Sequence, residues 1–155
     1  IWEGKKGQQS TPVMPLDMNV RPIIDEKYII PKTISYIKAQ AEAKKPFFVY
    51  VGYSEMHPPM MANPSFAGKS TARGGLYADV IAELDYRVGQ VLDAIKDAGI
   101  DDNTILVLTR RRGQTGFRVG VRRDSRLLFA ESGFDSRSVD GCGVGGLCAL
   151  FDSTG

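Results

Sequence analysis

The sequence contains few of the residues that most often indicate what a protein does. Its 155 residues include one histidine and two cysteines, Cys142 and Cys148, which say little about a redox compartment. No apolar run approaches the ~18 residues of a membrane-spanning helix. A formal net charge of +2 is too small to indicate nucleic acid or an anionic membrane as a partner. The overall composition is that of a globular protein, and no internal repeat is present.

The first residues also lack the marks of a start site. The segment Ile-Trp-Glu-Gly at residues 1–4 has no initiator methionine and no basic-then-apolar signal pattern. We therefore expect the chain to be an internal fragment of a longer protein.

Composition changes abruptly after Thr109. All nine lysines, eight prolines and six tyrosines lie in residues 1–109, whereas residues 110–155 carry eight of eleven arginines and nine of seventeen glycines. The formal charge is −1 before the change and +3 after it. We predict two parts: a catalytic-type domain fragment over 1–109, and an Arg/Gly/Ser-rich tail over 110–155. The tail is expected to be irregular, non-native or disordered, with no strand that completes a sheet.

The first part contains a helix and then a strand. Three prolines predict extended, irregular structure over residues 1–31. A short helix follows over 31–45, with Ile34 and Ile37 on one face, and the next proline ends it. Residues 47–51 are strand formers without alternation, which predicts a central strand covered on both faces.

A long helix and a second strand come next. Apolar residues recur at helical spacing from Leu76 to Ile95, and Gly99 is placed to adopt the left-handed conformation that ends a helix, with Ile100 folding back. Residues 104–109 form a second buried strand. Strand, helix, strand predicts a βαβ unit, and hence an α/β fold with a partial parallel sheet. Ligands of such sheets collect beyond the carboxyl ends of the strands, which is where His57 lies.

Four segments together resemble the arylsulfatase family. They read Lys-Pro-Phe-Phe-Val-Tyr-Val at 45–51, Met-His-Pro-Pro at 56–59, Glu-Leu-Asp-Tyr-Arg-Val-Gly at 83–89, and Asp-Asn-Thr-Ile-Leu-Val-Leu-Thr at 102–109. Their order and spacing match the family over at least residues 31–109. Each segment is weak alone, but four in register are specific.

The resemblance implies an alkaline-phosphatase-like α/β fold and hydrolysis of a sulfate ester. It also implies a formylglycine nucleophile, made from Cys or Ser, and a calcium ion that polarises the sulfate while Lys and His side chains bind its oxygens. Only His57 carries over, as the catalytic and substrate-binding histidine after the first strand. An imidazole suits that role because it can donate a hydrogen bond with or without full charge.

Three departures predict that this chain alone is inactive. It has no Cys-x-Pro-x-Arg motif, and the family's early metal-binding Asp pair would precede Ile1. The family's Ser-Asp-Asn-Gly is replaced by Arg-Arg-Arg-Gly at 110–113, and arginine cannot ligate calcium. We therefore expect neither the metal ligands nor the modified residue in this chain. The replacement coincides with the change in composition, which indicates a shift of reading frame or a sequencing error rather than divergence; resequencing the locus would test this.

Other polar residues have simpler interpretations. Glu55 could orient the imidazole, but an exposed loop carboxylate is the default, and Asp85 within the long helix is better explained as structural. Lys69 could reach an anion, although only its nearness in sequence supports this. The turn at 101–103 lacks the spaced ligands of a calcium loop. The two cysteines have no nearby histidine, so a zinc site is not expected, and a disulfide between them stays open.

Two other functions remain open. One is a phosphoesterase or phosphonate hydrolase of the same superfamily. The other is a non-enzymatic protein that binds anions or nucleic acid through the Arg-rich tail, although acidic residues interrupt that charge. The expected partner is a small sulfate ester or a sulfated glycan, with neither nucleic acid nor membrane. A periplasmic or secreted location is expected only by analogy with typical bacterial sulfatases, and the substrate and oligomeric state are not readable.

Overall fold

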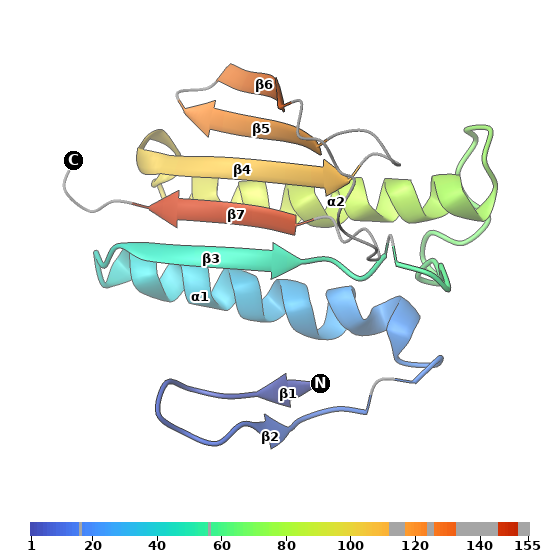
Figure 1. Cartoon of the computed structure of the whole chain (residues 1–155), viewed down its shortest axis with the longest axis horizontal. Coiled ribbons are helices and arrows are strands. Elements are labelled where there is room, and N and C mark those ends of the chain that lie inside the picture. The colour runs from blue at the N-terminus through green and yellow to red at the C-terminus, as the bar shows by residue number, and fades with distance from the viewer. Residues whose placement is uncertain (16, 56, 112–116, 124–125, 133–145, 152–155) are drawn as a thin grey trace.

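The structure is a computed structural model of the chain. It describes residues 1–15, 17–55, 57–111, 117–123, 126–132 and 146–151, with side-chain burial as far as Leu108. Figure 1 shows two helices beside a five-stranded sheet, and a small hairpin at the N-terminus. The strands are β1 (Trp2–Glu3), β2 (Thr11–Pro12), β3 (Phe47–Gly52), β4 (Thr104–Arg111), β5 (Phe117–Arg123), β6 (Arg126–Ser132) and β7 (Gly146–Phe151). The helices are η1 (Arg21–Ile23), η2 (Asp25–Ile29), α1 (Ile30–Glu42), α2 (Leu76–Asp97) and η3 (Asp101–Asn103).

The large sheet has the strand order β3-β7-β4-β5-β6, and every neighbouring pair is antiparallel. The prediction of a parallel pair is therefore wrong in its hydrogen bonding. β3 and β4 do run in the same direction, but β7 lies between them and pairs with both (Figure 1). The expectation of no strand after Thr109 is also wrong, since β5, β6 and β7 all lie there. The division into two domains at that point stays a prediction.

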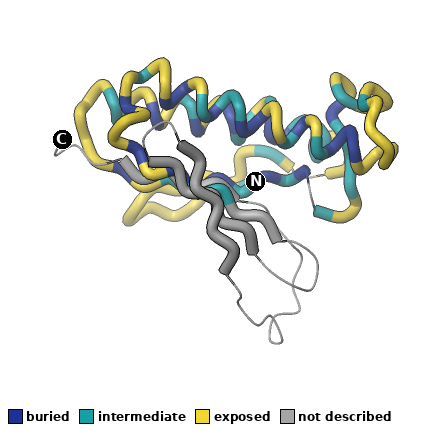
Figure 2. Tube along the Cα trace, turned by 90° about the horizontal axis from the view of Figure 1, so that it is seen from above, coloured by how far each residue is buried: buried dark blue, intermediate teal, exposed yellow. Residues whose placement is uncertain are grey.

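Both long helices cover one face of the sheet, so the fold has two layers (Figures 1 and 2). The core between the layers joins Ile37 of α1 and Val91 of α2 to Val51 of β3 and Leu106 of β4. Ile37 and Val91 are completely buried. This apolar layer fixes the carboxyl ends of β3 and β4 at the same edge of the sheet, where the site lies.

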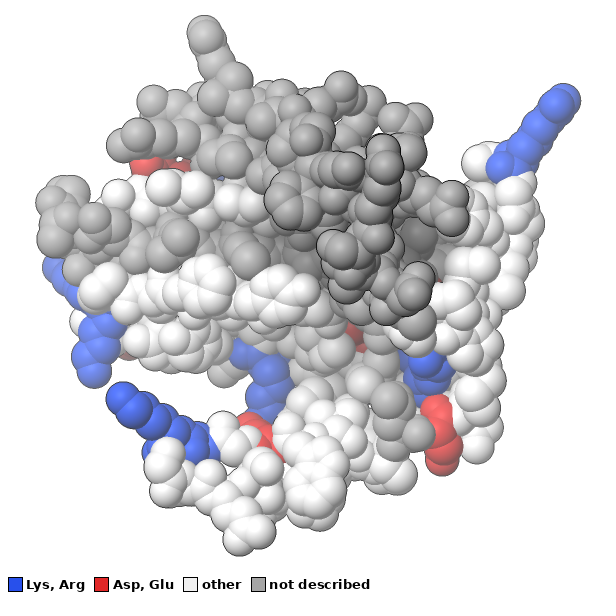
Figure 3. Space-filling view, viewed as in Figure 1, with Lys and Arg blue, Asp and Glu red and all other residues white. Residues whose placement is uncertain are grey.

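β3 is an edge strand with one buried and one open face. Phe47 and Val51 point into the core, whereas Phe48 and Tyr50 are each 58% exposed. In Figure 3 the described side chains along this strand are uncharged. The prediction of a central strand covered on both faces is therefore wrong. Side chains on successive residues of a strand point to opposite faces, so covering both would need a second helical layer.

The segment before α1 is more ordered than predicted. β1 and β2 pair as a short antiparallel ladder, and residues 21–29 form two helical turns that run into α1. Only the extended character of the first residues is confirmed. The π-helical turn η2 places Asp25 and Glu26 beside the β3 edge, and both enter the site below.

The connection from α2 to β4 follows the sequence pattern closely. Gly99 has φ +65°, the left-handed conformation expected at the end of a helix, and its N–H bonds to the Lys96 carbonyl at 2.9 Å. Ile100 folds back and is buried in the core. Residues 101–103 then make the predicted turn, as a single 3-10 turn.

Candidate functional site

His57 lies in the loop that follows the carboxyl end of β3. Its backbone N–H bonds to the Ser54 carbonyl at 3.2 Å, and its own carbonyl accepts a hydrogen bond from the Arg21 guanidinium. The ring Nδ1 lies 2.6 Å from the Pro58 carbonyl oxygen. A carbonyl only accepts, so Nδ1 carries the hydrogen and Nε2 is left for other contacts. The loop thus holds the imidazole at the sheet edge in a defined orientation.

Asp25 anchors this loop to the turn before α1. Its Oδ2 accepts hydrogen bonds from the Ser54 backbone N–H at 3.0 Å and from the Ser54 hydroxyl at 2.6 Å. Asp25 is almost fully buried, so these charge-assisted bonds form away from water. Through Ser54 they fix the backbone that leads to His57.

Glu55 is buried beside Asp25, which corrects the expectation of an exposed loop carboxylate. The side chain is 5% exposed, and no described residue bonds to either of its oxygens when it is ionised. Burial, followed by the hydrogen bond and the charge of Asp25, raises the pKa of Glu55 to about 9. Burial and these two carboxyls also raise the pKa of Tyr53. Glu55 is therefore protonated at neutral pH and can donate to Asp25.

The buried proton predicts a pH-dependent stability. Since the pKa of Glu55 rises from 4.5 to about 9 on folding, the folded chain binds the proton more tightly, and the free energy of unfolding falls as pH rises through this range. Glu55→Gln cannot ionise and should escape that loss. We expect its advantage over the parent to grow by up to about 1.4 kcal/mol per pH unit.

Urea denaturation across this pH range measures the effect. Glu42→Gln, on the exposed side of α1, is the matched control and should follow the parent curve. Parallel curves for Glu55→Gln and the parent would show that Glu55 is not protonated in the folded chain.

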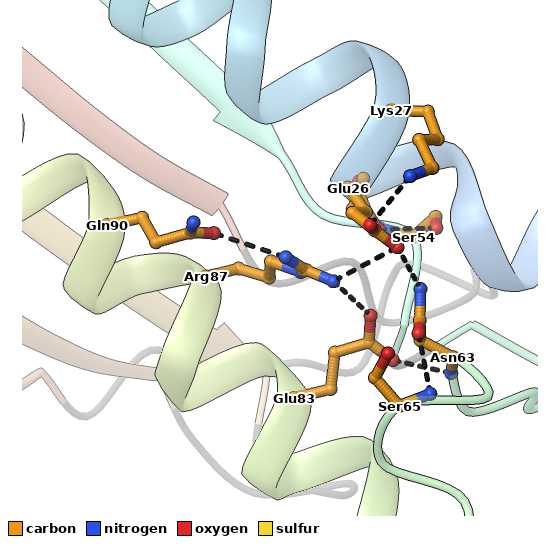
Figure 4. Close-up of polar contacts among 9 residues, drawn as sticks. Glu26, Lys27, Ser54, Asn63, Ser65, Glu83, Arg87 and Gln90 are labelled. Carbon is orange, nitrogen blue, oxygen red and sulfur yellow. Dashed lines mark hydrogen bonds and ion pairs between the residues drawn. The ribbon is translucent and has the colours of Figure 1, made fainter.

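A second polar network joins α2 to the loop after His57. Figure 4 shows side chains from η2, α2 and residues 63–65 converging. Glu83 accepts the Asn63 backbone N–H at 2.8 Å, and the Asn63 amide donates to Glu26 at 2.6 Å. The Arg87 Nη2 lies 3.3 Å from Glu83 and 3.8 Å from Glu26. The His57 loop, which runs from Ser54 to Asn63, is therefore hydrogen-bonded to η2 at both ends.

The two carboxylates of this network respond differently to their surroundings. Burial raises the pKa of Glu83, even though Asn63 and Arg87 both favour its charged form. Hydrogen bonds from Lys27 and then Asn63 lower the pKa of Glu26, which lies nearer the surface. Glu83 therefore depends on Arg87, because few other groups offset its desolvation.

The comparisons with known proteins agree on one family. The family model described as Sulfatase matches residues 8–110, which include both loop ends, His57 and all of α2. This chain belongs to the sulfatase family. Members of the family hydrolyse sulfuric esters, which favours this class over the phosphoesterase alternative.

Several curated sulfatases resemble the chain. It is 38% identical over 82 residues to an N-acetylgalactosamine-6-O-sulfatase of Bacteroides thetaiotaomicron, covering 53% of this chain and 15% of that protein. It is 31% identical over 100 residues to human arylsulfatase D, covering 63% and 16%. A rat steryl-sulfatase is 38% identical over 68 residues, covering 44% and 11%. The chain thus spans roughly a sixth or less of these sulfatases, and no solved structure matches it.

The other predicted residues of this sulfatase chain lie apart from His57 or outside its described part. Asp85 is exposed on α2, where it lines a shallow groove of about 500 Å³ with Lys38, and Lys69 is exposed on its loop. Asp79, which the sequence analysis did not single out, is buried and accepts the Gly68 and Ser70 N–H groups at 2.8 Å, which lower its pKa. Cys142 lies outside the described residues, as does the Cys148 side chain.

The described residues do not fit a calcium site. Among them, no group of three or more His, Cys, Asp or Glu side chains is placed to hold a metal ion. The buried carboxylates among them are instead used by protein hydrogen bonds, as at Asp79 and Glu83, or by the Asp25–Glu55 pair. The segment at residues 110–113, which replaces the family's Ser-Asp-Asn-Gly, continues past Arg111 into residues that the structure does not describe.

No described helix is long and apolar enough to cross a membrane.

Proposed function

We propose that this chain is the part of a sulfate-ester hydrolase that supplies His57 to the sulfate group. The observation that carries the proposal is the position of the sole imidazole, in a loop clamped at the carboxyl edge of β3, within the matched sulfatase region. β3 and β4 run in the same direction, because both pair antiparallel with β7, so their carboxyl ends share this edge. In open parallel α/β sheets that edge is where ligands bind.

The ring orientation defines what His57 can do. With Nδ1–H committed to the Pro58 carbonyl, Nε2 accepts a hydrogen bond when the ring is neutral and donates one when it is cationic. The cationic ring suits a sulfate oxygen, because a charged donor gives a stronger bond to an anion. The Arg21 guanidinium on the His57 carbonyl adds positive charge nearby.

Calcium and formylglycine are proposed for the whole enzyme only. The contribution proposed for the described residues is to bind and orient the ester. A sulfate ester, free or on a glycan, is the proposed ligand, as the names of the relatives suggest.

Binding of an aryl sulfate to the single histidine tests the proposal. In a ¹³C- and ¹⁵N-labelled chain, the His57 ring signals need no assignment by mutation, because the chain has one histidine. We expect 4-nitrophenyl sulfate to shift the Nε2 signal, and 4-nitrophenol, which lacks the ester anion, not to do so. His57→Asn should weaken binding about tenfold, the loss of one charged hydrogen bond.

Two other outcomes would count against this proposal. Equal or tighter binding of 4-nitrophenyl phosphate would favour the phosphoesterase alternative, and ring signals that ignore both esters would refute a substrate-contacting His57.

Turnover by the chain itself is expected to be absent. With calcium and 4-nitrophenyl sulfate, release of 4-nitrophenol should equal the uncatalysed rate, because the sequence has no Cys-x-Pro-x-Arg motif and the described residues contain no group of three or more metal-ligating side chains. Turnover that His57→Ala abolishes would overturn the expectation of inactivity.

A further inference from the structure

The Asp25–Glu55 pair is a buried group that the proposed role of His57 does not use. Both side chains are at least nine-tenths buried. With both ionised, Asp25 Oδ1 and the two Glu55 oxygens have no partner among the described residues. Two unpaired negative charges in one buried space are strongly unfavourable. One proton on Glu55 resolves this, because its O–H then donates to Asp25.

The pair is linked to His57 through one residue. Asp25 Oδ2 accepts both Ser54 donors, at 3.0 and 2.6 Å, and the Ser54 carbonyl accepts the His57 N–H at 3.2 Å. Any shift of the Asp25 carboxylate therefore releases the backbone that carries the imidazole.

Two packed elements oppose ionisation of Glu55: Asp25 faces it from η2, and Glu83 contributes negative charge from α2, whereas its own backbone N–H favours the charged form. The Tyr53 hydroxyl also faces this group, and the charges of Glu55 and Asp25 raise the pKa of Tyr53. Arg87 lies nearest to Glu83 and Glu26, so its positive charge mainly compensates those two carboxylates and not Glu55. The proton is thus held by the arrangement of the side chains.

We propose that Glu55 carries a proton and positions the His57 loop through Asp25 and Ser54. Glu55 is a positioning residue, since it acts through Asp25 and does not touch the ligand. Base removes the Glu55 proton to solvent and leaves two adjacent carboxylates, whose repulsion moves Asp25 away from Ser54. Binding of a sulfate ester at His57 should then fall, a consequence that rests on the proposed function.

The loop can be followed without any ligand. In the ¹³C-labelled parent, we expect the Glu55 carboxyl carbon to titrate at about pH 9, with the His57 ring carbons shifting in the same step. Glu55→Gln, whose amide can donate to Asp25, should lack this step. Glu55→Leu, which cannot donate, should show the shifted ring signal already at neutral pH. A ring shift that appears in all three proteins would not come from Glu55.

A step that Glu55→Gln shares with the parent would overturn the proposal, as would a Glu55 carboxyl that titrates below neutral pH. If Glu55→Gln does not fold, Asp25→Asn serves in its place. Its amide can donate to an ionised Glu55, so the Glu55 carbon should titrate at lower pH than in the parent, and an unchanged titration would refute the pairing.

Affinity for 4-nitrophenyl sulfate is the second readout. At neutral pH Glu55→Gln, whose amide can donate to Asp25, should bind like the parent, whereas Glu55→Leu should bind about tenfold more weakly. Equal affinities of the two variants would contradict the coupling. A parent that does not bind at neutral pH would defeat the proposed function alone, because the ring signals still decide the role of Glu55.

Discussion

Replacing Arg87 with Met is expected to lower the free energy of unfolding by about 3–5 kcal/mol. Arg87 and Glu83 are 4% and 2% exposed, and their charged groups lie 3.3 Å apart. Methionine fills much of the same space but carries no charge, so Glu83 would stay buried without its cation. Burial raises the pKa of Glu83 even though the Asn63 N–H and Arg87 both favour its charged form, so without Arg87 only the Asn63 N–H would offset the desolvation.

Urea denaturation of paired variants measures the loss. Lys27→Met removes the surface cation that pairs with Glu26. Because the Lys27 side chain is 59% exposed, this change should lower the free energy of unfolding by less than about 1 kcal/mol. Adding Glu83→Gln to Arg87→Met should restore a large part of the stability, because the neutral amide still accepts the Asn63 N–H. Equal effects of Arg87→Met and Lys27→Met would contradict a buried ion pair.

Ile37→Ala should destabilise the chain by about 2–5 kcal/mol. Ile37 is 0% exposed and lies where α1 meets β3 and α2. Truncation removes buried methyl groups and leaves a cavity that two helices and a sheet cannot easily close. This residue is therefore expected to be among the most sensitive apolar positions in the described core.

The matched control is the same change at Ile105, which is 40% exposed on β4 and should cost far less. If Ile37→Ala does not fold, Ile37→Val gives a measurable loss of about 1 kcal/mol. Similar denaturation midpoints for Ile37→Val and the parent, or for the two alanine variants, would show that the α1 interface does not support the fold.

The helical part of the fold was readable from the sequence because its signals are local. The apolar spacing from Leu76 onward, Gly99 and Ile100 each depend on residues within a few positions, and the structure confirms all three. The position of β7 between β3 and β4 was not readable. It depends on pairing residues 146–151 with β4, 37 to 47 positions earlier, and with β3, 94 to 104 positions earlier, and no periodicity in the sequence indicates such pairings.

In the site, too, local signals were readable from the sequence and most long-range contacts were not. The sequence placed His57 after the first strand through a family motif, and its role stays a prediction. It missed Asp25, Asn63 and Arg87, and treated Glu55 as exposed. Asp25 and Asn63 make their contacts across 20 to 37 positions, so neither spacing nor composition reveals them. Arg87 and Glu83 are four residues apart on one helix, so their spacing was a usable signal. For Glu55 the available signal was a carboxylate two residues before the strand-end histidine, and burial cannot be read from it.

In the π-helical turn η2, two consecutive carboxylates hold opposite ends of the His57 loop. Asp25 holds the start of the His57 loop, and Glu26 holds Asn63 at its far end. A deletion or insertion of one residue in this turn would rotate both carboxyls away together. Length changes there should therefore disorder the whole loop at once, whereas insertions in the exposed stretch around Thr71 to Arg73 should be absorbed locally.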